Sequence, residues 1–165
     1  MYNRYLNIFN HPSERTLAKA AILGPILDLH HNCDYHSKLP IAFFDRIISP
    51  AIRHGSLKVF FDQRGDPIAY VVWAYLSPQV EQRIFETGNF VLHISEWNEG
   101  DSLWILDFLA PFGHCRRVLR SLVDDQFKSH KTLTYFRPKN GSLEFFSVPL
   151  SVRSMGGMEV ALTIT

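Results

Sequence analysis

The stretch Leu103–Ala110 constrains this sequence most, because it is apolar at every position except Asp107. A strand that is apolar throughout is normally buried on both faces. Pro111 and Gly113 follow closely and end it. A lone carboxylate inside such a strand is costly unless it is paired, hydrogen-bonded or protonated. Asp107 therefore needs a partner, either a structural one such as a backbone amide or an arginine, or a functional one in an active site.

Apolar spacing, caps and turn residues predict the other elements. One helix begins near Glu14 after its cap Ser13, is interrupted or kinked at Gly24-Pro25, and passes into a loop over 26–38. The rest are, in order, a helix over 40–55, hairpin strands over 57–61 and 67–76, a helix over 78–87, strands over 90–94 and 102–112, a helix over 114–129, and hairpin strands over 132–138 and 142–148. This order predicts a single α/β (α+β) domain over 1–165, with helices packed on a mixed, mostly antiparallel sheet.

Composition narrows the function classes. The 165 residues suffice for one domain, and 46% hydrophobic with 20% charged residues is typical of a globular protein. A net charge of +1 argues against broad nucleic-acid binding. We find no apolar signal region and no run near the ~20 residues that span a bilayer. Two cysteines without a CxxC motif favour a reducing cytoplasm.

Histidine and cysteine gather after the first helix, at His30, His31, Cys33 and His36. A zinc site is conceivable, but no second close-spaced ligand pair exists elsewhere, so we expect no metal. A Cys33–His36 nucleophile pair is a sharper alternative, although without a motif around it a half-buried thiol is the simpler interpretation. We expect solvated side chains at His30, His31, His54, His114 and His130.

The predicted 114–129 helix carries or adjoins five cations, Arg116, Arg117, Arg120, Lys128 and Lys131. The default interpretation is the solvated face of an amphipathic helix. The functional alternative is a docking face for an acidic partner.

Three ordered segments resemble the toxin-activating lysine acyltransferases that acylate RTX protoxins. Residues 100–113, GDSLWILDFLAPFG, are similar to the family's signature, and residues 67–77, PIAYVVWAYLS, are similar to its Pro-x-Ala-Tyr-x-x-Trp-Ala strand. The third segment comprises Ile22-Leu23-Gly24, His36 with Pro40, and Pro50-Ala51-Ile52. The resemblance is strongest over 20–148, and Cys33 stands where the family often has serine.

The resemblance implies a fold similar to the GNAT acyltransferases, acyl–acyl carrier protein as donor without a bound cofactor, and internal lysines of an RTX protoxin as acceptors. It implies that His36 and Asp107 are catalytic. Histidine can take the proton that a lysine amine must lose, and a nearby carboxylate would stabilise the imidazolium. We expect the substrate or the carrier to be bound by Cys33, Tyr70, Arg116, Arg117 and Arg120.

Several alternatives stay open at this stage. Direct transfer is preferred over an acyl-His36 intermediate on fold analogy alone. An acetyl-CoA-dependent GNAT enzyme would need a phosphate-binding turn, of which residues 110–114 are a poor version. A catalytically inactive relative that only binds a toxin or carrier protein would hold His36 and Asp107 far apart or plugged. A monomer and a homodimer are both compatible with the sequence, and no nucleic acid or stable membrane insertion is expected.

Overall fold

The computed structural model describes residues 12–139 and 141–150. Its centre is a five-stranded sheet in the order β1-β2-β3-β4-β5. The strands are β1 (Leu57–Phe61), β2 (Pro67–Leu76), β3 (Ser102–Leu109), β4 (Thr132–Lys139) and β5 (Ser142–Pro149). All neighbours are antiparallel except β3 and β4, which are parallel. The predicted mixed, mostly antiparallel sheet is therefore confirmed.

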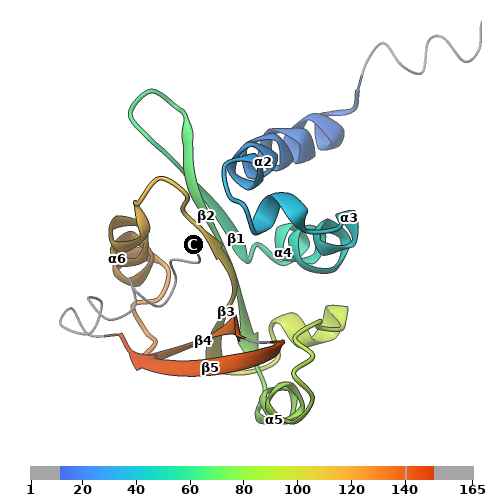
Figure 1. Cartoon of the computed structure of the whole chain (residues 1–165), viewed down its shortest axis with the longest axis vertical. Coiled ribbons are helices and arrows are strands. Elements are labelled where there is room, and N and C mark those ends of the chain that lie inside the picture. The colour runs from blue at the N-terminus through green and yellow to red at the C-terminus, as the bar shows by residue number, and fades with distance from the viewer. Residues whose placement is uncertain (1–11, 140, 151–165) are drawn as a thin grey trace, which may run out of the picture.

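Helices cover both faces of the sheet (Figure 1). On one face, α6 (Cys115–Asp125) packs against side chains such as Val71 and Ile105. On the other face, the α2–α4 region and α5 (Pro78–Thr87) pack against Val72 and Trp104. Alternate side chains of the central strands point to opposite faces of the sheet and are buried in two separate cores. This explains why β2 and β3 are apolar almost throughout. Within the described residues, no helix combines the length and apolarity needed to cross a membrane.

The first helix, α2 (Glu14–His31), is longer than expected. Ser13 caps it by accepting a hydrogen bond from the Thr16 amide at 3.2 Å, as predicted. The expected interruption is wrong, because the helix continues through Pro25. A proline ring normally clashes with the Cβ of the residue before it, and that residue here is Gly24, which has none. Because the helix is uninterrupted, His30 in its last turn lies against Tyr70 of β2.

The second helical segment contains three pieces. They are α3 (Ile41–Phe43), the π-helical turn η2 (Phe44–Ile48) and α4 (Ser49–His54). Pro40 precedes the segment in extended conformation, and Gly55 ends it with a φ of 64°, as its sequence predicts. A π-helical turn widens the helix by one residue and often occurs near functional sites. This turn buries Ile47 and Ile48 against the sheet.

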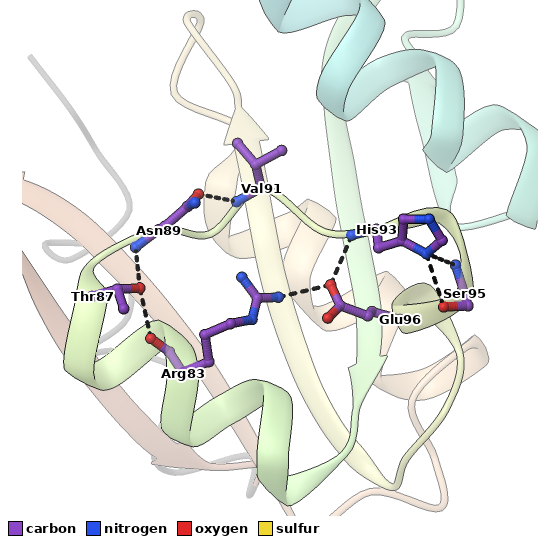
Figure 2. Close-up of polar contacts among 7 residues, drawn as sticks. All are labelled: Arg83, Thr87, Asn89, Val91, His93, Ser95 and Glu96. Carbon is purple, nitrogen blue, oxygen red and sulfur yellow. Dashed lines mark hydrogen bonds and ion pairs between the residues drawn. The ribbon is translucent and has the colours of Figure 1, made fainter.

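The segment between α5 and β3 is not the predicted strand over 90–94. It runs as a loop into the 3₁₀ turn η3 (Ile94–Trp97), as Figure 2 shows. Side chains take its backbone donors: Asn89 Oδ1 accepts from the Val91 amide at 3.0 Å, and Glu96 Oε2 accepts from the His93 amide at 2.7 Å. Arg83 Nη2 also donates to Glu96, at 2.7 Å. Donors used in this way cannot join a sheet ladder.

Candidate active site

A bulge in β3 shapes the position of Asp107. Val72 of β2 pairs with Asp107, whereas the next residue, Trp73, pairs with Ile105, so Leu106 is the extra residue. A bulge bends its strand and redirects side chains, and it often lies beside active sites. The Asp107 side chain is 13% exposed, so the carboxylate is largely but not wholly removed from water.

His36 reaches this carboxylate from the α2–α4 region, which covers this face of the sheet. It begins the short 3₁₀ turn η1 (His36–Lys38), which follows α2 after a four-residue connection and is held by the Ser37 amide donating to the Cys33 carbonyl at 2.9 Å. Its side chain is only 2% exposed, and Nε2 lies 3.1 Å from Asp107 Oδ1. The expected proximity of these two side chains, 71 positions apart, is confirmed.

Each ring nitrogen of His36 has a different neighbour. Nε2 faces Asp107, whereas Nδ1 lies 3.4 Å from the sulfur of Cys33, a partly buried free thiol. The carboxylate can only accept, so Nε2 carries the hydrogen and the Nδ1 lone pair faces the thiol. Cys33, His36 and Asp107 are thus linked by consecutive contacts, in the order of a nucleophile, a base and an orienting acid.

The other carboxylate oxygen of Asp107, Oδ2, takes part in a second set of hydrogen bonds. The Tyr70 hydroxyl donates to Asp107 Oδ2, and the Nε2 atom of His30 lies 2.8 Å from that hydroxyl. His30 Nδ1 lies 3.2 Å from the His36 carbonyl oxygen, which closes a ring of contacts. Tyr70 is fully buried, so its side chain supports the carboxylate and offers no surface to a carrier protein.

The expectation of a solvated His30 is wrong, since the residue is only 5% exposed. Within α2 the buried positions are Ile26, Leu29 and His30, which follow helical spacing. The signal that could have identified His30 was therefore present, but only for a helix continued past Pro25. Of the remaining histidines, His54 is exposed and stacks on Trp97 with ring centroids 5.8 Å apart.

Burial and charge shift the pKa values of this cluster. Burial acts to lower the pKa of His36, but the hydrogen bond and charge of Asp107 outweigh it, so the pKa is raised above 6.5. Burial acts to raise the pKa of the Cys33 thiol, but hydrogen bonds from His36 outweigh it and the pKa is lowered. Burial, together with the nearby His36, lowers the pKa of His30. Burial and then Asp107 raise the pKa of Tyr70 well above 10, so its hydroxyl stays a neutral donor.

Asp107 also lines a cleft between β3 and β4. The two strands pair only at Trp104–Thr134 and Ile105–Tyr135, and beyond these pairs they diverge. The cleft that opens there is largely apolar and is lined by Tyr35, Leu39, Phe43, Phe90, Ile105, Leu106, Asp107, Phe108, Tyr135, Phe136, Arg137 and Pro138. An apolar cleft with one carboxylate at its wall is suited to a hydrophobic ligand whose polar end meets the cluster.

The structure does not bring the predicted arginines into this cluster. Arg116, Arg117 and Arg120 lie exposed on α6, which covers the opposite face of the sheet from α2 (Figure 1). The predicted apolar side of that helix is confirmed, since Val118 and Leu122 are buried. Within residues 12–139 and 141–150, no three His, Cys, Asp or Glu side chains are arranged to hold a metal ion.

Comparison with known proteins supplies the family. The model of the RTX toxin acyltransferase family matches residues 15–145. The lysine-acyltransferase RtxC of Vibrio cholerae is 29% identical over 118 residues, which are 71% of this chain and 76% of the relative. The leukotoxin-activating lysine-acyltransferase LktC of a Pasteurella haemolytica-like strain is 30% identical over 127 residues, 76% of each chain. The RTX-II toxin-activating lysine-acyltransferase ApxIIC of Actinobacillus pleuropneumoniae is 37% identical over 92 residues, 56% of each chain. Since the family model spans most of the sequence, this chain belongs to the RTX toxin acyltransferase family.

Proposed function

We propose that this protein transfers a fatty acyl chain from acyl–acyl carrier protein to internal lysine side chains of an RTX protoxin. The observation that carries the proposal is the buried His36–Asp107 pair, with 3.1 Å between Nε2 and Oδ1, at the wall of an apolar cleft. The names of the relatives RtxC, LktC and ApxIIC support lysine as the acceptor.

His36 acts as the general base. A lysine amine has a reference pKa of about 10.4, so at neutral pH fewer than about one in a thousand is ready to attack a thioester. A base near the reacting atoms contributes about 10²–10⁴-fold in rate. Asp107 holds the hydrogen on Nε2 and stabilises the imidazolium that forms when Nδ1 takes a proton. Contact between the two side chains favours an active enzyme over an inactive relative.

The cleft between β3 and β4 holds the acyl chain. Its aromatic and aliphatic walls, such as Phe43, Phe90 and Leu106, offer a chain of methylene groups a place out of water. Asp107 lies in the same wall, so the chain's thioester end would lie next to the catalytic pair. The apolar lining supports a fatty acyl donor over acetyl-CoA, whose two-carbon acyl group has little apolar surface to bury.

The test is intact-mass spectrometry of a lysine-containing protoxin fragment incubated with the protein and either palmitoyl–acyl carrier protein or acetyl-CoA. We expect acylation of the fragment from the carrier-bound donor alone. The variant His36→Ala should leave the fragment unmodified, whereas His31→Ala is the matched control, because His31 is an exposed histidine at the end of the preceding helix, α2. Acetylation from acetyl-CoA at a comparable rate, or full activity of His36→Ala, would contradict the proposal.

A further inference from the structure

The basic nitrogen of His36 faces a thiol and not the open cleft. Asp107 occupies Nε2, and the Cys33 sulfur lies 3.4 Å from Nδ1. We propose that Cys33 is the nucleophile that carries the acyl chain between donor and acceptor as a thioester, with His36 as its base. This inference rests on the proposed acyl transfer and adds a step to it.

The position of Cys33 suits a transient carrier. It lies just after the C-cap of α2, where its amide donates to the His30 carbonyl at 3.2 Å, and its side chain is partly exposed. A surface hollow begins at the next residue and is lined by Asp34, Tyr35, Lys38 and Leu39. Tyr35 and Leu39 also line the apolar cleft, so the loop that holds the thiol adjoins the acyl site.

The alternative, direct attack by a lysine amine, fits the geometry less well. Nδ1 is the nitrogen that must take the amine proton, and a side chain already lies within hydrogen-bonding distance of it. The amine would have to displace Cys33 before it could reach the base. A thiol needs no displacement, and thiolates are strong nucleophiles even when only a fraction is ionised. Hydrogen bonds from His36 also lower the pKa of this thiol despite its partial burial.

The reaction then has two balanced steps. In the first, Nδ1 takes the thiol proton, the Cys33 sulfur bonds to the acyl carbon, and the bond from that carbon to the carrier's sulfur breaks; the carrier thiolate receives the proton from Nδ1. In the second, a neutral lysine amine bonds to the acyl carbon and the bond to Cys33 breaks. Nδ1 takes the amine proton and returns it to the Cys33 sulfur. No oxidant or further reactant is consumed.

The test is a single-turnover reaction with myristoyl– or palmitoyl–acyl carrier protein and no acceptor, quenched in acid and analysed by intact-mass spectrometry. We expect the wild type to gain one acyl chain that neutral hydroxylamine removes, as it does from thioesters. Peptide mapping should place the chain on Cys33. The variant Cys33→Ala should gain none, whereas Cys115→Ala is the matched control, since Cys115 is buried on the opposite face of the sheet.

Transfer to the protoxin fragment separates the inference from the proposed function. Loss of the nucleophile in Cys33→Ala should lower that rate by roughly 100-fold or more, at the lower end of what a positioned catalytic group contributes. Thermal unfolding shows whether each variant is folded. If Cys33→Ala acylates lysine at the wild-type rate while His36→Ala does not, Cys33 is not the carrier and the proposed function stands. If the wild type acylates neither itself nor the fragment, the proposed function fails as well.

Discussion

Removing the charge of Asp107 is the most informative single perturbation. Asp107→Asn keeps the size of the side chain, and its amide oxygen can still accept from His36 Nε2. Tyr70 can then turn its hydroxyl proton to His30, whose Nε2 is 2.8 Å away, and accept from the new amide. The variant therefore removes the negative charge while the hydrogen-bond pattern can be rebuilt. What is lost is the stabilisation of the imidazolium that forms during transfer.

The size of that loss follows from the geometry. Two unit charges about 4 Å apart interact by about 4 kcal/mol at an effective dielectric constant of about 20. The carboxylate is 13% exposed, so solvent screening reduces this figure, and we expect about 2–4 kcal/mol. At about 1.4 kcal/mol per decade, kcat/KM should fall by roughly 30- to 1000-fold. The assay is the initial rate of lysine acylation of a protoxin fragment as a function of donor concentration.

The pH dependence provides a second readout of the same variant. In the wild type the pKa of His36 is raised above 6.5, so activity should fall as the pH drops through that raised value. Without the carboxylate, the burial that lowers the pKa remains, and this acid limb should move to lower pH. A raised folded-state pKa also means that the contact stabilises the fold fully below pH 6.5 and loses this effect as the pH rises through the raised pKa. Unchanged kcat/KM together with an unmoved acid limb would refute the role of Asp107.

Three further predictions concern other parts of the chain. His36→Ala should abolish transfer and lower the free energy of unfolding by about 1–3 kcal/mol, more than a loop position suggests, because the ring is buried between partners on both nitrogens. Thermal and denaturant unfolding measure this, and a change below about 0.5 kcal/mol would contradict the buried contacts. Gly100→Ala should destabilise strongly, since a Cβ there would collide with the backbone oxygen of Leu76 at the end of β2. Reversing Arg117 and Arg120 to Glu should slow binding of the acidic carrier at low salt and raise KM with little change in kcat; equal binding rates would leave α6 as a solvated face.

Much of the fold could be predicted because its elements are encoded locally. β1, β2 and α5 have the predicted ends, and α5 runs over Pro78–Thr87. The segment over 90–94 was not predictable from propensity, because side chains of neighbouring turns take its donors. Membership of the RTX toxin acyltransferase family, expected from three ordered segments, is confirmed. The likeness to GNAT enzymes stays a prediction.

The candidate site could be predicted in part. Asp107 was identifiable because a carboxylate in an apolar strand needs a partner, and its proximity to His36 is confirmed. His30 was not, because its burial depends on a helix that passes through a proline, and only the structure shows that the helix continues there. Tyr70 was expected to bind substrate or carrier on resemblance; its contact with Asp107 depends on the bulge in β3.

The limited pairing of β3 with β4 has a consequence for how the molecule opens. Every residue of β4 pairs with β5, but only two residues of β4 pair with β3. The β4–β5 hairpin is therefore held to the other strands mainly by side chains such as Leu133 and Tyr135, which share a core with β2, β3 and α6. An acyl chain seated between β3 and β4 would add apolar contacts between the β4–β5 hairpin and the other strands. The amides of β4 and β5 should accordingly show the largest slowing of hydrogen exchange when the cleft is filled.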